Sequence, residues 1–391
     1  MTQVLAVFQE EWRRIFALRP AFSVLVLAII IYSVFYPQPY LHEALRKVPI
    51  AVVDWDDSVS SRTLIRRLDA TADVSVDRVL PDLVTAQRAV FTRDISGILV
   101  IPQYFERELL HGRPSPIALY ADASYFLLFQ RVYAGVSAVA RMMGAEVETA
   151  RLIATGVDPA QAPAVADPLV LTLVPLFNPQ GGYATYVLPA AFILILQQTL
   201  LIGVGLLGTL PPPAPTAGNR AAAAAGPLTT VLGKLTAYLT LQMLILPFYL
   251  VALPYLYGVP RLGSVTTILA LALPFVLSVG SLGLVVASIF RKPITVQLVF
   301  ATLGLPLFFL AGFSWPAEAI PQAIRDVALL IPSSSAIDGL VRVAQLGAPL
   351  SDVRQQFLTL WGLTFLYGIL ALLLEARKRR SRTPSPAQQA L

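Results

Sequence analysis

The sequence contains no cysteine and few charged residues. Of its 391 residues, 13% are Asp, Glu, Lys or Arg, whereas soluble domains carry about a quarter. Without cysteine, disulfides and thiolate metal sites are excluded, and with only His42 and His111 we expect no histidine-rich metal centre. Hydrophobic residues make up 56% of the chain and the mean hydropathy is +0.69. This balance indicates a membrane protein.

Six apolar segments are long enough, or nearly so, to cross a bilayer as helices, which takes about 20 residues. These segments are 20–37, 183–208, 229–257, 264–290, 294–313 and 356–374. The first follows arginines, as in a signal peptide, but no small-residue cleavage site comes after it, so we expect an uncleaved helix. The pattern therefore predicts an α-helical polytopic membrane protein with six transmembrane helices.

The distribution of Lys and Arg predicts which side of the membrane each loop occupies. If the N-terminus is cytoplasmic, the cytoplasmic segments hold twelve basic residues against three acids, Glu10, Glu11 and Glu375. The basic residues are Arg13, Arg14, Arg19, Arg220, Lys234, Arg291, Lys292, Arg377, Lys378, Arg379, Arg380 and Arg382. Both termini are thus expected to be cytoplasmic. The net charge of +6 is a topology and lipid-headgroup signal, and we expect no nucleic-acid partner.

Residues 38–180 have the composition of a soluble domain between the first and second spans. Strand-like runs alternate with helical ones, which predicts a small α/β domain outside the cytoplasm. The expected strands are 49–53, 74–79, 97–101 and 116–120, and the expected helices are 60–70, 82–91, 103–110 and 125–155. The last helix is about 45 Å long if continuous, enough to carry the domain away from the membrane.

Three further segments complete the predicted organisation. Residues 1–19 have apolar positions at helical spacing (Val4, Leu5, Phe8, Trp12, Ile15, Phe16), which predicts an amphipathic cytoplasmic helix at the membrane surface. Residues 209–228 form a Pro/Ala-rich cytoplasmic loop, of which only the alanine half can be helical. Residues 375–391 form a basic cytoplasmic tail.

Residues 314–350 interrupt the membrane pattern with proline and serine before an amphipathic run. Two short helices joined by a break predict an external re-entrant hairpin, and a plain external loop is the alternative. Irregular backbone survives at membrane depth only where protein shields it or water reaches it. Ser333-Ser-Ser335 in this segment has no histidine near it in sequence and predicts no nucleophile.

Two glycine motifs resemble nucleotide-binding loops without their context. Gly203-Val-Gly-Leu-Leu-Gly208 matches G-x-G-x-x-G, but it ends a long apolar run instead of following a strand, so close helix packing is the favoured interpretation. Gly233-Lys234 lacks the upstream glycine and the following Ser or Thr of a phosphate loop. The chain is therefore expected to bind no nucleotide cofactor. If the protein is a transporter powered by ATP, another subunit supplies the ATP-binding site.

Asp54-Trp-Asp-Asp57 could be a carboxylate cluster for a metal, but it lies between a strand and a helix start. Turn formation and helix capping by Asp54–Asp57, with Ser60 or Ser61 as N-cap, are the favoured interpretation, and no metal site is expected.

Two adjacent glutamines, Gln197 and Gln198, lie within the second apolar segment. Unpaired amides are costly in hydrocarbon, so these side chains should face protein or water. Hydrogen bonding between helices and the lining of a transport path are both open. Because consecutive residues point about 100° apart on a helix, at most one of the two should be the main path residue.

Several stretches in this order resemble the ABC type-2 (ABC-2) exporter permeases, in the bacterial branch with a large periplasmic insert after the first span. They are Val48–Asp57, Gly97–Arg107, Leu119–Ser124, Phe177-Asn-Pro179, Tyr186-Val-Leu-Pro189, Phe313–Pro332 and Ala336-Ile-Asp-Gly-Leu340. Many members also carry a charged segment after span two. Here residues 209–230 have Arg220 as their one charged residue, although Gly233-Lys234 is present.

The resemblance implies a multi-pass permease subunit in the bacterial inner membrane, paired with a second permease half and with cytoplasmic ABC ATPase subunits. That pairing would be a homodimer or a heterodimer. A periplasmic membrane-fusion adaptor and an outer-membrane channel are possible further partners of this branch. The expected function is export of a hydrophobic or amphipathic substrate, with no catalytic residue in this chain. A membrane-anchored receptor or assembly platform is the alternative.

The resemblance also implies the roles of particular residues. Spans two and five would line the path, and the N-terminal helix and the loop after span two would contact the ATPase. The expected path residues are Gln197, Gln198, Gln297, Phe308 and Phe309. The expected ATPase-coupling residues are Trp12, Arg13, Arg14, Arg220 and Lys234.

Overall fold

The structure is a computed structural model that describes residues 2–40, 45–169, 171, 174, 176–178, 181–211, 219–313, 315 and 317–380. The chain divides into two compact units. The α/β unit is Ala44–Pro175, and the helical unit combines Met1–Glu43 with Leu176–Leu391. Much of the proline half of the predicted loop (212–218) and the tail from 381 onward lie outside the described residues.

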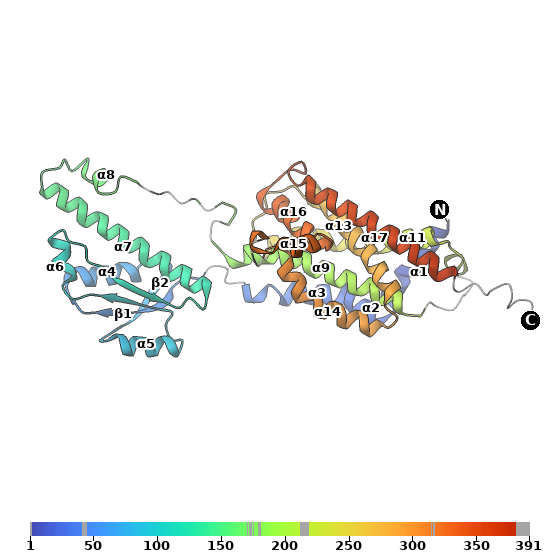
Figure 1. The fold of residues 1–391 in the computed structure, drawn as a ribbon, viewed down its shortest axis with the longest axis horizontal. Coiled ribbons are helices and arrows are strands. Elements are labelled where there is room, and N and C mark those ends of the chain that lie inside the picture. Colours follow the sequence, from blue (N-terminus) through green and yellow to red (C-terminus); the bar gives the residue numbers. More distant parts are fainter. Residues whose placement is uncertain are drawn as a thin grey trace, which may run out of the picture. The chain divides into compact units, whose positions relative to one another are not determined.

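The α/β unit contains a four-stranded sheet in the order β2-β1-β3-β4 (Figure 1). The strands are β1 (Val48–Asp54), β2 (Val74–Leu80), β3 (Gly97–Ile101) and β4 (Ala118–Ala121). β1 pairs in parallel with β2 and β3, and β4 is antiparallel to β3. Parallel strands need helical crossovers between them. Those crossovers are α4 (Val59–Asp69) and α5 (Leu83–Phe91).

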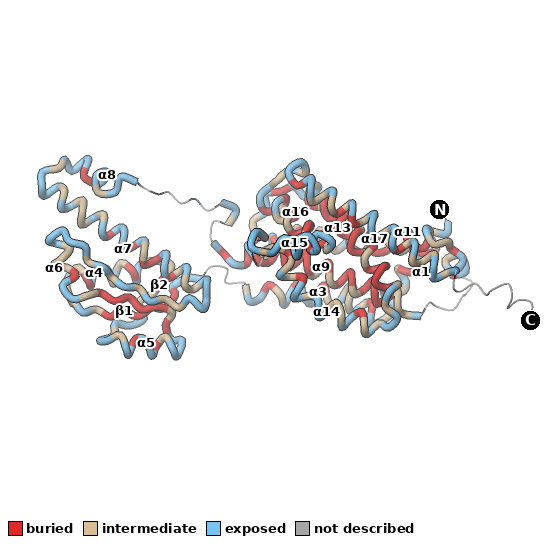
Figure 2. Tube along the Cα trace, viewed as in Figure 1, coloured by how far each residue is buried: buried red, intermediate tan, exposed pale blue. Residues whose placement is uncertain are grey.

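The sequence of β1 is a continuous apolar run because residues on both faces of this strand are buried. Its side chains alternate between the two faces of the sheet. Ile50 and Val52 pack with α4, α6 (Phe105–Leu110) and α7 (Phe126–Ala154), while Ala51 and Val53 pack with α5. Both faces are therefore covered, and Figure 2 shows the buried residues along β1.

Helix α7 is one continuous helix, and its first half belongs to the core of the α/β unit. Val132, Val136, Val139 and Met143 recur every three or four residues and are all buried against the sheet side. The short helix α8 (Ala162–Ala166) packs against α7. Much of the helix that we expected to act as a spacer is therefore part of the packed domain, because its apolar stripe is wide enough to cover the sheet.

Asp54 folds the turn after β1. Its Oδ1 accepts hydrogen bonds from the backbone N–H groups of Asp56 (3.0 Å) and Asp57 (3.1 Å), as the capping and turn interpretation predicts. The N-cap of α4 is Ser58, not Ser60 or Ser61. Ser58 and Ser61 form a reciprocal capping box, which satisfies two N–H groups that would otherwise lack partners.

Asp56 serves a different helix. Its Oδ2 accepts a hydrogen bond from the backbone N–H of Glu106 (2.9 Å), at the start of α6. Burial alone would raise the pKa of Asp56, but hydrogen bonds from Ser58 and from the backbone of α6 outweigh it and lower the pKa below its ordinary value.

The helical unit contains, among the described residues, six helices that are long and apolar enough to cross a membrane. They are Arg19–Tyr40, Tyr183–Thr209, Pro227–Leu256, Val265–Ile289, Pro293–Leu310 and Arg354–Arg380. A further bent pair of helices would make seven if it counts as one span. Each predicted apolar segment overlaps one of the six. The protein is thus mostly helical in this unit, as expected for a polytopic membrane protein.

Two of the six helices include a π-helical turn. The first consists of α2 (Arg19–Phe22), η1 (Ser23–Leu27) and α3 (Ala28–Phe35), and η2 (Gln38–Tyr40) follows. The third consists of α11 (Pro227–Pro247), η3 (Phe248–Ala252) and α12 (Leu253–Leu256). Pro247 and Pro254 lack the backbone N–H of an ordinary helix residue, which accounts for the irregular turn between them.

The other four helices are α9 (Tyr183–Thr209), α13 (Val265–Ile289), α14 (Pro293–Leu310) and α17 (Arg354–Arg380). Figure 2 shows buried residues concentrated along α9 and α13, while α14 and α17 have few buried residues. The predicted boundary between the last span and a cytoplasmic tail at residue 375 is not a helix end. Glu375 and Arg379 form an i,i+4 ion pair (3.2 Å), which continues α17 to Arg380.

The predicted hairpin region contains two short helices, α15 (Gln322–Ala328) and α16 (Pro332–Leu346), at 86° to each other. Pro332 begins α16 and ends the continuity with α15. α16 packs against α9, α13 and α17, and Ala336 and Ile337 are buried. We call this end of the unit the hairpin end, and the opposite end, where α1 (Thr2–Ala17) packs, the α1 end.

Candidate functional site

The candidate site consists of two parts of the helical unit that contain the residues expected from the sequence. One is the middle and hairpin end of α9, together with α14 and α16. The other is the α1 end, where α1 contacts α9 and α11.

Gln197 lies at the contact between α9 and α16. Its side chain is 1% exposed, and both polar atoms have a partner in Ser333. Nε2 donates to Ser333 Oγ (2.9 Å), and Oε1 accepts from the Ser333 backbone N–H (2.7 Å). Ser333 is in the first turn of α16, where backbone N–H groups have no partner within the helix. Gln197 therefore completes the start of α16.

Gln198 faces α14 instead. Its Nε2 lies 3.4 Å from the carbonyl oxygen of Phe300, and a Cβ at Gly304 would lie 3.2 Å from the same Nε2. Its Oε1 is buried and has no hydrogen-bond partner among the described residues. A buried polar atom without a partner is costly, and water or a ligand would satisfy it.

The other expected path residues are all on α14. Gln297 is exposed, Phe309 is 52% exposed, and Phe308 is partly buried against the core of the helical unit. The Phe308 ring contacts the rings of Phe309 (5.7 Å between centroids) and Phe313 (4.6 Å). The structure thus brings Gln198 together with α14 and separates it from Gln197.

Aromatic rings connect η2 with α9 and with the segment that follows α14 at the hairpin end. Contacts run from Tyr40 to Tyr183 (5.7 Å), from Tyr183 to Tyr186 (6.2 Å) and from Tyr186 to Phe313 (6.4 Å). The Tyr186 hydroxyl also donates a hydrogen bond to the Phe313 carbonyl oxygen. Tyrosines of this kind are enriched where spanning helices reach the membrane–water interface.

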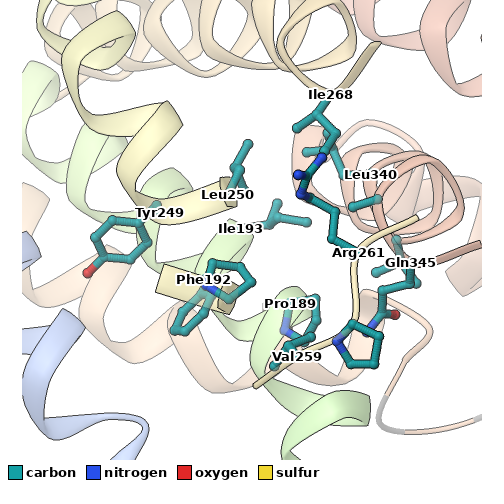
Figure 3. Close-up of a pocket in the computed structure, with 14 residues that line it drawn as sticks. Pro189, Phe192, Ile193, Tyr249, Leu250, Val259, Arg261, Ile268, Leu340 and Gln345 are labelled. Carbon is teal, nitrogen blue, oxygen red and sulfur yellow. The ribbon is translucent and has the colours of Figure 1, made fainter. Parts of the chain in front are cut away.

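A small apolar pocket lies beside α9 at the same end (Figure 3). Pro189, Phe192 and Ile193 line it from α9, with Tyr249 from η3 and Leu340 from α16. Its volume of about 30 Å³ has room for about one water molecule. This pocket therefore has no room for a transport substrate.

The three glycines of the G-x-G-x-x-G match lie at close contacts between helices, which confirms the packing interpretation. A Cβ at Gly203 would overlap Leu25 of η1, and a Cβ at Gly208 would overlap Ala287 of α13. A Cβ at Gly205 would lie 2.8 Å from Cγ1 of Val296 in α14. Each glycine thus allows a different helix to approach the backbone of α9.

Gly233 has the same role between α11 and α1. A Cβ there would lie 2.6 Å from the Val7 Cβ and 2.9 Å from the Val4 carbonyl oxygen. The buried stripe of α1 is Val7, Glu11 and Ile15, whereas Leu5 is 55% exposed. Only part of the predicted apolar face is therefore buried, because the contact at Gly233 orients α1 with Glu11 toward the protein.

Glu11 is at the centre of a buried polar cluster, defined here as Glu11, Arg14, Lys234 and Tyr238. Glu11 is 2% exposed, and the Tyr238 hydroxyl of α11 donates a hydrogen bond to its Oε1. Arg14 Nη1 lies 3.3 Å from Glu11 Oε2. Arg14 Nη2 also donates to the carbonyl oxygen of Leu207 (2.9 Å), in the last turn of α9, where carbonyls lack helical partners.

The charges of this cluster determine the ionisation of Glu11. Burial by itself would raise the pKa of Glu11. The positive charges of Lys234 and Arg14, with the hydrogen bonds from Tyr238 and Arg14, outweigh burial and hold the pKa below its ordinary value. Glu11 is therefore an anion near neutral pH, despite its burial.

The expected coupling residues fall into two groups. Arg14 and Lys234 belong to the buried cluster, and Trp12 is partly buried and contacts the rings of Phe8 and Phe16. Arg13 is 66% exposed beside Glu10, and Arg220 is exposed at the start of α10 (Arg220–Ala223), which packs against α1. The exposed pair of arginines is thus on neighbouring elements.

The sequence patterns did not indicate the contacts of Glu11, Tyr238 and Ser333 at the candidate site. Glu11 lies four residues before the apolar Ile15, which places both on the same face of a helix. This spacing was the one signal in the sequence that Glu11 faces the protein. No pattern indicated the Ser333 contact, because its partner is 136 residues away. Among the described residues, no group of three or more His, Cys, Asp or Glu side chains could hold a metal ion.

Comparison with known proteins gives the family. The family model described as "ABC-2 family transporter protein" matches residues 21–373, most of the chain. The chain belongs to this family. It is 23% identical over 338 residues to the inner membrane transport permease YhhJ of Escherichia coli, covering 84% of this chain and 85% of that protein. No solved structure matches significantly.

Two other relatives have names that describe resistance or multidrug transport. The linearmycin resistance permease protein LnrN of Bacillus subtilis is 23% identical over 341 residues, covering 83% of this chain and 88% of LnrN. The probable multidrug ABC transporter permease YbhS of Escherichia coli is 27% identical over 161 residues, covering 40% of this chain and 42% of YbhS. The ABC-2 family assignment thus agrees with the resemblance noted in the sequence.

Proposed function

We propose that this chain is the permease subunit of an ATP-binding-cassette exporter in a bacterial inner membrane. It moves a hydrophobic or amphipathic substrate out of the cytoplasm or the inner membrane. A separate cytoplasmic subunit hydrolyses the ATP. The observation that carries the proposal is that the family match, 21–373, reaches into all six helices that could span a membrane. The names of YhhJ, LnrN and YbhS support a transport role.

The orientation follows from the basic residues. Arg13, Arg14 and Arg220 are at the α1 end, and so is the run Arg377–Arg380, which ends α17. The positive-inside rule puts this end in the cytoplasm. An even number of spans then puts both termini inside and the α/β unit in the periplasm, where an adaptor and an outer-membrane channel are further expected partners.

The path lies along α9 and α14, between two permease halves. Gln198 faces α14 and has an unpartnered buried oxygen, while Gln297 and Phe309 are exposed on α14. Phe308 is adjacent to Phe309 in the aromatic contacts. Gln197 stabilises the first turn of α16 through its hydrogen bonds to Ser333. It therefore affects substrates through the position of α16.

Coupling to the ATPase takes place at the α1 end. Arg13 and Arg220 present exposed positive charge to the partner subunit. The buried cluster of Glu11, Arg14, Lys234 and Tyr238 joins α1 to α9 and α11, so a displacement of α1 reaches the helix that lines the path. This compensates for a loop after α9 in which Arg220 is the one charged residue.

The test is co-purification followed by a functional assay. The tagged chain is purified from its native membranes, co-purifying proteins are identified by mass spectrometry, and an ABC ATPase among them is reconstituted with the permease. We expect the permease to stimulate ATP turnover severalfold. The double variant Arg13→Ala/Arg220→Ala should reduce this stimulation, while Arg354→Ala, at the hairpin end, should not. If no ATPase is present, or its turnover is unaffected, the receptor or assembly-platform function is favoured instead.

A further inference from the structure

A cavity of about 330 Å³ lies at the hairpin end, separate from the contact of α9 with α14 described above. Residues from the end of α14, from α15, from α16 and from the start of α17 line it. One wall is apolar and includes Leu310, Ala328 and Leu329. We call Asp338, Arg342 and Gln356, which also line the cavity, the polar wall, and Arg325 of α15 completes the lining.

The polar wall is held by hydrogen bonds that use both oxygens of Asp338. Oδ1 lies 2.8 Å from Nε of Arg342, and Oδ2 accepts a hydrogen bond from Nε2 of Gln356 (2.5 Å). Gly339 makes this arrangement possible, because a Cβ there would lie 3.2 Å from the Cβ of Gln356. Asp338 is therefore already paired with Arg342, and each of its oxygens has a partner.

Arg325 gives the cavity an excess positive charge. Within the described part of the chain, Arg325 makes no ion pair within 4.0 Å and no side-chain hydrogen bond. Its guanidinium group presents several donors that match a carboxylate or phosphate in geometry. The cavity thus combines one unpaired cation with an apolar wall.

Two further polar atoms in this lining lack partners. Ser334 Oγ and Gln356 Oε1 are buried and have no hydrogen-bond partner among the described residues. Buried polar atoms are normally satisfied by protein or by ordered water. A ligand hydroxyl, or a water that accompanies the ligand, would satisfy them here.

We propose that this cavity binds an amphipathic anion through its headgroup. Its phosphate or carboxylate pairs with Arg325, its hydroxyls face Ser334 and Gln356, and its apolar part lies against Leu310, Ala328 and Leu329. A water molecule takes about 30 Å³, so a cavity of about 330 Å³ has room for a ligand several times larger than water. This volume suits a headgroup and the first carbons of a chain. The inference rests on the proposed function, because it identifies anionic amphiphiles as the class of substrate that the permease moves.

Binding is measured on the purified permease without any ATPase. The binding result therefore does not depend on whether the protein is a transporter. Native mass spectrometry in non-ionic detergent measures adducts with 1-palmitoyl-lysophosphatidate and with 1-palmitoyl-glycerol, which has the same chain without phosphate. We expect the anion to bind at least tenfold more tightly, Arg325→Ala to remove most of this difference and Arg325→Lys to retain part of it.

Arg354→Ala is the matched control, since Arg354 is an exposed arginine at the start of α17 that does not line the cavity. Its binding should equal that of the unmodified protein. Equal binding of the two lipids, or an equal loss in Arg325→Ala and Arg354→Ala, would indicate surface lipid only and overturn the proposal. Ala328→Phe, which fills the cavity without altering charge, should weaken binding of the anion, and unchanged binding there would also contradict it.

Discussion

At the scale of single residues, Glu11 connects three helices at the α1 end. It belongs to α1, accepts a hydrogen bond from Tyr238 of α11, and orients Arg14 toward the last turn of α9. A buried ion pair contributes little net stability, because desolvation offsets the attraction, but the removal of one partner is costly. Glu11 is therefore a position where a small chemical change should have a large effect.

We predict that Glu11→Gln lowers the stability of the helical unit by about 3 kcal/mol, because Arg14 and Lys234 then lie together without a counter-ion. Thermal unfolding of the purified protein, followed by tryptophan fluorescence, measures this effect. Glu10→Gln removes the ion-pair partner of the exposed Arg13 and should change stability by less than about 1 kcal/mol. Equal effects of the two variants would contradict the buried cluster.

The pH dependence of the same unfolding gives a second readout. Because the pKa of Glu11 is lower in the folded protein, the folded state holds this proton less tightly than the unfolded chain. The contribution of Glu11 is then complete above the unfolded pKa of about 4.3 and is lost as the pH falls through the lower folded value. The stability difference between the unmodified protein and Glu11→Gln should be constant from pH 8 to 6 and shrink below about pH 4.

At the scale of elements, the glycines of α9 determine how closely its neighbours approach. Gly208→Ala should destabilise the helical unit by about 1–3 kcal/mol, since the added methyl group overlaps Ala287 of α13. Gly362→Ala in α17 is the control, because a Cβ there meets nothing within 4 Å. The control should be neutral or stabilising by about 0.5–1 kcal/mol through helix propensity. Denaturation midpoints of the two variants test the difference.

The two adjacent glutamines should separate in function. Gln197→Leu removes both hydrogen bonds to Ser333 and should cost about 1–2 kcal/mol, with little further loss on adding Ser333→Ala. Gln198→Leu removes an amide with an unpartnered oxygen, so stability should be nearly unchanged while substrate selectivity shifts. Thermal unfolding and transport by reconstituted vesicles measure the two effects. A transport defect confined to Gln197→Leu would contradict the assignment of Gln198 to the path.

Elements were predictable from the sequence where one local signal dominated. Apolar length identified the six long helices. A continuous apolar run identified β1, because β1 is buried on both faces, and alternation identified β2. Partners distant in sequence were not predictable. The contacts of Gln197 with Ser333, and of Glu11 with Tyr238, depend on which helices are neighbours, and a single sequence contains no record of that. The turn at Asp54–Ser58 was predictable because its hydrogen bonds are local.

At the scale of the whole molecule, the absence of cysteine makes the topology directly testable. Gln87→Cys adds an exposed thiol to the α/β unit, and Ala223→Cys adds one to α10 at the α1 end. We expect a membrane-impermeant maleimide to label Gln87→Cys in intact spheroplasts, and Ala223→Cys only after permeabilisation. The unmodified protein, which has no thiol, is the blank. Labelling of both sites in intact spheroplasts, or in the reverse order, would refute the proposed orientation.

The contacts at Gly203, Gly205 and Gly208 have a mechanical consequence. Over less than two turns, the backbone of α9 is held against the first spanning helix, α14 and α13, with no side chain of α9 itself at the three contact points. A stiff junction of this kind transmits a tilt instead of damping it. Under the proposed coupling, the end of α9 next to Arg14 would be a pivot shared by three neighbours. We therefore expect substitutions that loosen these contacts to reduce transport per ATP hydrolysed in reconstituted vesicles, even where the fold is retained.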